Sequence, residues 1–210
     1  GRLLDDDAQA RADAVYGLSF IPDPRSIEAM RNAASDRDEG VRRLTAQSLG
    51  RLGDETGLGV LLDLLGDPVP EVRVAAVDAL GLFGARAVPV VLAAMPGLTL
   101  AEPAGLRLEA ATRALGRVGD DRALEPLSAT LRIGGTSARV AAAGALGDLG
   151  LSAGIPALRA ALGDPAPEVR QAAFRSIVTI AGSAAREVIE SYIATETDPG
   201  LKETARALLS

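Results

Sequence analysis

The chain has 210 residues, of which 48% are hydrophobic and 2% aromatic, with 22 basic and 28 acidic side chains and a net charge of −6. It has no Cys and no His, which excludes disulfides, thiolate or imidazole metal sites, and catalysis by Ser-His-Asp or Cys-His groups. The negative charge also disfavours a general polyanion-binding surface. No membrane span or signal peptide is visible, and we expect a cytoplasmic protein. Its 21 Arg against one Lys indicate a GC-rich, bacterial genome.

One segment returns along the chain at a nearly constant period. It reads VRRLTAQSLG at 41–50, VRVAAVDALG at 72–81 and ARVAAAGALG at 138–147. The large aliphatic residue near its end recurs at spacings of 31, 31, 35, 31, 31 and 32 residues. Those aliphatic residues are Leu18, Leu49, Leu80, Leu115, Leu146, Ile177 and Leu209. A period of this length is typical of solenoid proteins.

Each repeat unit is predicted to form two helices. The first has apolar residues at helical spacing, for example Val72, Ala75, Ala76, Ala79, Leu80 and Phe83. A glycine follows, the residue typical of a helix end in the left-handed conformation. These glycines are Gly53, Gly84, Gly119, Gly150 and Gly182. The apolar stripe of the second helix is too narrow to close a core alone, so each unit must stack on the next.

We predict a single repeat array over residues 1–210. Its units are expected near residues 5–35, 36–66, 67–101, 102–132, 133–163 and 164–197, with a partial unit at 198–210. Neither end shows the distinct polar capping repeat that solenoids use for solubility. We therefore expect the chain to be a piece of a longer protein.

The frame Asp-Pro-x-x-x-Val-Arg, followed by alanines and Leu-Gly, resembles HEAT repeats, especially the short HEAT-like repeats first noted in phycobilin lyase subunits. The resemblance implies an all-α, right-handed solenoid of about six and a half helical hairpins. In that family this Asp and Arg form a ladder of polar contacts from repeat to repeat. The matching residues are Asp5, Arg11, Asp36, Arg42, Asp67, Arg73, Asp164 and Arg170.

Two units depart from this frame. The fourth has 35 residues, with extra chain at 96–103, and Leu108 stands at the aligned Arg position while Arg107 lies one residue early. We expect the ladder to be interrupted there and the curvature to change around residues 96–108. In the fifth unit Ile133 replaces the aligned Asp, so Arg139 is expected to lose its partner.

Acidic clusters are the remaining candidates for catalysis or metal binding. Asp5, Asp6 and Asp7 have the carboxylates that Mg²⁺ or Ca²⁺ prefers. Directly before a helix, however, Asp is the expected cap and complements the helix dipole. The same holds for the acidic residues at 36–39, 54–55 and 120–121. We therefore predict no catalytic, cofactor-binding or metal-binding residue.

Two activities of HEAT-like proteins can be weighed against the composition. The HEAT-like deoxyhypusine hydroxylases hold iron with His-Glu pairs, which a chain without His cannot supply. HEAT-like glycosylases need a basic concave face and aromatic residues to handle an extruded base. The net charge is negative and Trp is absent, so no nucleic-acid partner is expected.

The outward positions of the second helices are the predicted binding surface. They form a shallow apolar strip flanked by carboxylates, on the side that is usually concave. Its residues are Glu28, Val60, Asp63, Leu64, Val90 and Ala94. Such a strip predicts a partner site for a helix or peptide; in the alternative, adjacent helices simply cover these side chains.

The predicted function is a non-enzymatic protein–protein interaction scaffold, with partner identity and oligomeric state left open. The alternative is an accessory or regulatory subunit of a modifying enzyme, such as a lyase-like complex. A third possibility, a designed repeat protein, is disfavoured by the irregular 35-residue unit, because designers keep repeats uniform.

Overall fold

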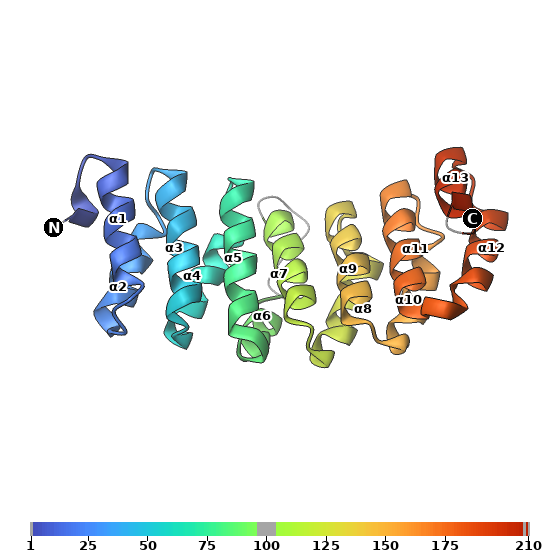
Figure 1. Cartoon of the computed structure of the whole chain (residues 1–210), viewed down its shortest axis with the longest axis horizontal. Helices are drawn as coiled ribbons and strands as arrows, with labels where there is room; N and C mark the ends of the chain where they lie inside the picture. Colours follow the sequence, from blue (N-terminus) through green and yellow to red (C-terminus); the bar gives the residue numbers. More distant parts are fainter. Residues whose placement is uncertain (1, 96–103, 208, 210) are drawn as a thin grey trace. The chain divides into compact units, whose positions relative to one another are not determined.

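The computed structural model describes residues 2–95, 104–207 and 209, and in these residues it contains thirteen α-helices and no strand. The predicted all-α solenoid class is confirmed. The longer, first helices of the repeats are α1 (Ala8–Leu18), α3 (Glu39–Leu52), α5 (Pro70–Phe83), α7 (Ala104–Val118), α9 (Thr136–Leu149) and α11 (Pro167–Ala181) (Figure 1). The second helices are α2 (Pro24–Ala33), α4 (Leu58–Leu64), α6 (Val88–Ala94), α8 (Leu124–Ile133), α10 (Ile155–Ala161) and α12 (Ala185–Thr195). A further helix, α13 (Pro199–Ala207), follows them.

Helix α5 shows why these segments are helical. Pro70 occupies its first turn, where a missing N–H has no cost. Its predicted apolar stripe is buried as a whole, from Val72 to Phe83. The helix ends at Gly84, and all five glycines predicted after first helices have positive φ angles between 52° and 70°. Only glycine adopts such angles without strain.

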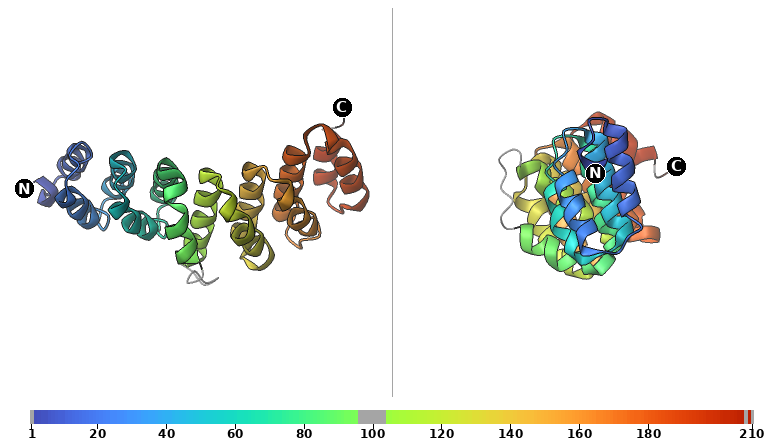
Figure 2. Two further views of the ribbon diagram at one scale, coloured as in Figure 1. Left: turned by 90° about the horizontal axis from the view of Figure 1, so that it is seen from below. Right: turned by 90° about the vertical axis from the view of Figure 1, so that its left-hand side faces the viewer.

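The contacts divide the chain into two compact units, residues 1–118 and 119–210. In the first unit α1, α3, α5 and α7 pack side by side, and the short helices α2, α4 and α6 lie along them (Figure 2). In the second unit α9 packs against α11, with α8, α10 and α12 along them and α13 against α12. Each unit is therefore a stack of helical hairpins.

Small residues let the first helices approach closely. A Cβ at Gly50 of α3 would lie 2.9 Å from both the Cα and the Cβ of Ala79 on α5. A Cβ at Gly147 of α9 would lie 2.8 Å from the Cβ of Ser176 on α11. Real Cβ contacts are wider than this, so the recurring Leu-Gly glycine is required by helix packing.

The extra chain predicted at 96–103 lies outside the described residues, and with it the change of curvature expected around 96–108. No single described helix has both the length and the hydropathy of a bilayer span. The one helix pair that has them together, Pro70–Arg86 with Val88–Ala94, is bent by 117°.

Candidate functional site

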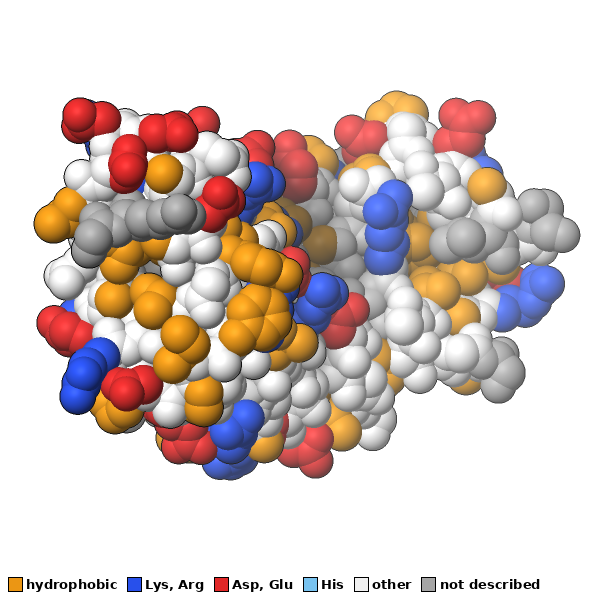
Figure 3. Space-filling model, turned by 60° about the vertical axis from the view of Figure 1, so that its left-hand side comes forward, with side chains coloured by type: hydrophobic (Ala, Val, Ile, Leu, Met, Phe, Trp, Pro, Cys, Tyr) orange, Lys and Arg blue, Asp and Glu red, His pale blue; other side chains and the backbone are white. Residues whose placement is uncertain are grey.

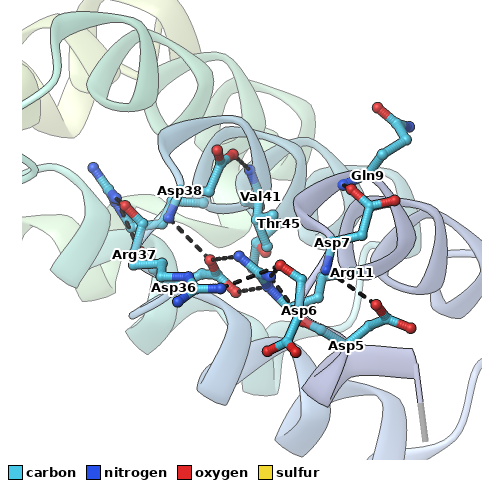
Figure 4. A network of polar contacts seen from close by, with 11 residues as sticks. Asp5, Asp6, Asp7, Gln9, Arg11, Asp36, Arg37, Asp38, Val41 and Thr45 are labelled. Atoms are coloured by element: carbon cyan, nitrogen blue, oxygen red, sulfur yellow. Dashed lines mark hydrogen bonds and ion pairs between the residues drawn. The ribbon is translucent and has the colours of Figure 1, made fainter.

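Arg11 shows how the polar residues of the turns are used. Its Nε and Nη2 both donate to the carboxylate of Asp36 in the following repeat at 2.8 Å (Figure 4). Its Nη1 donates to the backbone oxygens of Asp5 and Asp6 at 2.8 and 3.1 Å. Asp36 also accepts from the backbone N–H of Asp38. One arginine therefore joins the turn before its own helix to the turn of the next repeat.

The same arrangement recurs in both units. Arg42 donates to the carboxylate of Asp67 at 2.7 and 3.0 Å and to the backbone oxygen of Asp36 at 2.9 Å. Arg139 donates to Asp164 at 2.8 and 2.9 Å. We call these contacts, with those of Arg11 and Arg170, the polar ladder. Bidentate pairs of this kind are the strong form of charge-assisted hydrogen bond.

The expectation that Arg139 loses its partner is wrong. The carboxylate of each such pair comes from the following repeat, 25 or 26 residues later, and Asp164 supplies it here. Within its own repeat the arginine binds only a backbone oxygen, so no aspartate side chain is needed there. Gly134 provides that oxygen at 2.8 Å.

The last contact of the ladder uses residues that the sequence analysis missed. Arg170 donates to both carboxylate oxygens of Glu196 at 2.9 Å. The buried Tyr192 donates its hydroxyl to Glu196 at 2.6 Å, and its ring stacks on Phe174 with centroids 4.2 Å apart. Asp198 accepts from the N–H of Leu201 at the start of α13.

The ladder has no further described contact at the irregular unit. Arg73 donates to the backbone oxygens of Asp67 and Pro68 at 2.7 and 3.0 Å. Among the residues outside the gap at 96–103 it has no carboxylate partner. Arg107 lies 4.0 Å from the carboxylate of Asp63 and donates to its backbone oxygen, so it bridges to α4 instead.

Three ladder carboxylates, those of Asp36, Asp164 and Glu196, are held in the ionised form. Hydrogen bonds from Arg11 keep the pKa of Asp36 below its usual value. Burial raises the pKa of Asp164, but the hydrogen bonds from Arg139 and from the N–H of Ala166, together with the positive charges of Arg139 and Arg170, outweigh it, and the net pKa is lowered. Arg170 lowers the pKa of Glu196 further, and burial, with the bond to Glu196, raises the pKa of Tyr192. Groups held this way are poor proton donors or acceptors at neutral pH.

A second polar and aromatic cluster lies on the outward side of the first helices in the first unit. The guanidinium carbon of Arg51 is 5.0 Å from the ring centroid of Tyr16 and 5.5 Å from that of Phe20. The two rings meet edge to face at 5.1 Å, and Nη1 of Arg51 donates to Oγ of Ser19 at 3.1 Å. Cation–π contacts of this kind attract the guanidinium to the rings.

Arg51 also forms one wall of a groove of about 710 Å³. The groove is lined by residues of α3, α5 and α7: Gln47, Arg51, Ala75, Asp78, Ala79, Gly81, Leu82 and Arg117. Leu82 is 68% exposed, and Arg117 pairs with Asp78 at 2.8 Å. We call the groove together with Tyr16 and Phe20 the outer face. Figure 3 shows hydrophobic side chains gathered beside basic ones on the nearer part of this unit.

A profile of HEAT repeats matches residues 2–80, 58–134 and 135–210. The chain belongs to the HEAT-repeat family. Its HEAT fold resembles human deoxyhypusine hydroxylase in complex with glycerol, with 22% identity over 99% of this chain and 92% of that one and a TM-score of 0.42. It also resembles the CpcE–CpcF complex of phycocyanin lyase from Nostoc sp. PCC7120, with 21% identity over 99% and 90% of the chains and a TM-score of 0.49.

An engineered protein is similar too, with 19% identity over 85% of this chain and 95% of that one and a TM-score of 0.46. At these identities a likeness concerns the HEAT fold and carries no information on activity. No curated protein matches the sequence.

The outer face of this HEAT array was missed by the sequence analysis, although a signal for it exists. Phe20, Arg51, Leu82 and Arg117 stand at the same place in four consecutive repeats, at spacings of 31, 31 and 35 residues. This position holds Phe, Arg, Leu and Arg in turn, so no one residue type marks it. A search for residues that recur in every repeat therefore does not detect this position.

The strip predicted on the second HEAT helices is buried at its two central residues and exposed at its flanking carboxylates, Glu28 and Asp63. Val60 and Leu64 are each only 3% exposed, because α4 packs against α3, α5 and α6. Val90 and Ala94 are half-buried, and Asp63 is exposed. The alternative, that adjacent helices cover the strip, is correct for its two central residues.

The acidic clusters of the HEAT turns act as caps, as predicted. The side chain of Asp7 accepts from the N–H of Gln9, and that of Asp38 from Val41. Asp120 caps the turn before α8, where the hydrogen bond from Arg122 lowers its pKa to about 2. Within the described ranges, no three acidic side chains converge as a metal site would require.

Proposed function

We propose that this HEAT array is a non-enzymatic protein–protein interaction scaffold that binds a partner helix or peptide. The observation that carries the proposal is the outer face. There, large apolar side chains such as Phe20 and Leu82, 60% and 68% exposed, surround an arginine whose guanidinium carbon lies over aromatic rings. Exposed apolar side chains gathered beside a groove are typical of a partner site.

The proposed surface lies on the first helices rather than on the second. Val60 and Leu64 are buried, so a substitution there would disturb the fold before it disturbed a partner. The guanidinium groups of the ladder arginines already donate hydrogen bonds within the fold. The polar and aromatic groups of the outer face therefore remain for recognition.

Panning the folded chain against a phage-displayed library of random peptides tests the proposal. We expect individual synthetic peptides from the selection to bind saturably, at one site per chain, in isothermal titration calorimetry. Failure to recover any peptide that binds the folded chain above the urea-unfolded chain would contradict a scaffold role. A small molecule retained through purification, detected by native mass spectrometry, would instead favour an accessory subunit of a modifying enzyme.

A further inference from the structure

We infer that the outer face binds an extended peptide segment in which acidic side chains flank an apolar one. The inference rests on the proposed function and names its partner by chemistry. It follows from the charge of the face, the geometry around Arg51, the lining of the groove and the spacing of the repeats.

Beyond their first turns, the outward positions of α3, α5 and α7 are basic in an acidic protein. They carry four arginines against two carboxylates, on a chain whose net charge is −6. The nine positions are Arg43, Gln47, Arg51, Val74, Asp78, Leu82, Glu109, Arg113 and Arg117. The first turns of α3 and α5 add the exposed carboxylates of Glu39 and Glu71, so the basic part of the surface is the end of the helices that carries Arg51 and Arg117. Of the two carboxylates among the nine, Glu109 is paired with Arg113 at 2.9 Å and Asp78 with Arg117 at 2.8 Å.

Two arginines of this surface have no acidic partner in the described part of the chain, Arg43 and Arg51. Charge complementarity therefore favours a partner that brings carboxylates to them. The rest of the chain, with its acidic excess, would repel such a partner. Binding is thus directed to this surface.

Arg51 is arranged to receive a carboxylate. Its guanidinium carbon lies over Tyr16 and Phe20, and one of its nitrogens donates to Ser19. The guanidinium has five N–H groups in a planar fork, so donors remain for a bidentate bond to an incoming carboxylate. Because the side chain is already ordered, little rotamer entropy is lost on binding.

The groove beside Arg51 suits an apolar side chain. The buried methyl groups of Ala75 and Ala79 lie at its bottom, and the exposed Leu82 forms one edge. An apolar side chain placed there would contact three aliphatic groups and cover part of Leu82. The exposed amide of Gln47 lines the same groove and offers both a donor and an acceptor to a peptide backbone.

The repeat spacing sets the order of the peptide side chains. Packed helices lie about 8–10 Å apart. An extended peptide in the polyproline II conformation advances about 3.1 Å per residue with three residues per turn, so every third side chain returns to the same side about 9 Å further on. Arg51, Leu82 and Arg117 are equivalent positions of α3, α5 and α7. Arg117 donates to Asp78 through Nη2, and the other N–H groups of its guanidinium remain for a second carboxylate. A peptide of this kind would therefore meet the three positions at every third residue, which gives the order acidic, two residues, apolar, two residues, acidic.

A single-stranded nucleic acid fits this surface less well. Its phosphates are charged at every nucleotide, so some would face Asp78 and Glu109. A peptide places its carboxylates only where the arginines lie. The observations therefore favour the peptide.

The test uses the full chain and peptides recovered from the random library. We expect the recovered peptides to share the acidic–apolar–acidic order. Arg51→Gln and Leu82→Gln should each weaken their binding at least about tenfold, as for hot-spot residues. The matched controls are Arg175→Gln on α11 and Ile133→Gln at the end of α8, an exposed arginine and an exposed aliphatic residue of the second unit. They should leave affinity within about twofold.

Other outcomes would overturn the inference. Peptides that bind, but carry basic or purely apolar sequences or are unaffected by Arg51→Gln and Leu82→Gln, would refute it and leave the scaffold role standing. Recovery of no peptide would refute both. Tighter binding of a fluorescent oligothymidylate than of any peptide, lost in Arg51→Gln, would assign the face to nucleic acid instead.

Discussion

Arg42 and Arg51 lie nine residues apart on the same helix, α3, and are used in opposite ways. Arg42 is mostly buried, and its guanidinium binds both the carboxylate of Asp67 and the backbone of the preceding turn. Arg51 is exposed, has its guanidinium carbon over two aromatic rings and has no described acidic partner. The first belongs to the polar ladder and the second to the outer face.

The difference teaches how a repeat array separates stability from recognition. The ladder residue recurs every repeat or nearly so, since every junction between hairpins needs the same contact. The outer face changes from Phe20 to Arg51 to Leu82 to Arg117 at one equivalent position. Free variation at a position shows that the fold does not require a particular side chain there.

Acid should have the largest effect on the ladder, because it acts on several of its contacts at once. The pKa values of Asp36, Asp164 and Glu196 are lowered in the folded state. Their contribution is therefore full above the unfolded values of about 4 and is lost as the pH falls through the folded values. We expect the urea midpoint to fall steadily below about pH 5. An unchanged midpoint down to pH 3 would contradict a stabilising ladder.

Removing one ladder arginine should be the most damaging single substitution. Arg42→Ala leaves the carboxylate of Asp67, 7% exposed, without its cation. We expect the free energy of unfolding to fall by about 2–3 kcal/mol in urea titrations. Arg73→Ala is the matched control, since its described contacts are two backbone oxygens, and should cost about 1 kcal/mol. Equal losses would show that the carboxylate contact is not what stabilises the junction.

Two glycines of α9 compare the two sides of a first helix. Gly147 lies on the side packed against α11, and Gly144 lies on the open side. Gly147→Ala would place a methyl group 2.8 Å from the Cβ of Ser176 and should destabilise by about 1–2 kcal/mol. Gly144→Ala meets nothing within 4 Å and should stabilise by up to about 1 kcal/mol. Thermal unfolding of the two variants should therefore shift in opposite directions. Shifts of the same sign would contradict the close approach of α9 and α11.

Removing the hydroxyl of Tyr192 should have the smallest effect on stability of the changes to the ladder. Tyr192→Phe removes the 2.6 Å hydrogen bond to Glu196 but keeps the ring stacked on Phe174. We expect a loss of about 1 kcal/mol, because Arg170 and the N–H groups of Thr197 and Asp198 still satisfy the carboxylate. Differential scanning calorimetry measures the change. A loss as large as that of Arg42→Ala would mean that the hydroxyl, not the arginine, holds this junction.

Most of the fold could be predicted from the sequence because the apolar spacing of the first helix, and the glycine that follows it, recur from repeat to repeat. The buried stripe of α5 and the five positive-φ glycines were correctly placed from spacing alone. The contacts of the ladder were harder to predict, because the sequence frame places an Asp and an Arg six residues apart in the same repeat. The arginine instead reaches a carboxylate about 25 residues ahead, which only the stacking of repeats brings close.

The candidate site could not be predicted in the same way. Helical spacing shows that Val60 and Leu64 point away from their own first helix, but not that α6 packs over α4. Conversely, nothing in the local sequence distinguishes Tyr16 and Phe20 from the buried aromatics Phe83, Phe174 and Tyr192. The exposure of Tyr16 and Phe20, and the approach of Arg51 from the next repeat, depend on how neighbouring hairpins are placed.

The most direct test measures stability and peptide affinity together for Arg42→Ala and Arg51→Gln. Urea midpoints and calorimetric titrations with one library-selected peptide would be recorded on the same samples. Arg42→Ala should lower the midpoint and, while the chain stays folded, keep the affinity. Arg51→Gln should keep the free energy of unfolding within about 0.5 kcal/mol and weaken the peptide. If either substitution changed both quantities, or each changed the wrong one, the separation of ladder and outer face would be contradicted.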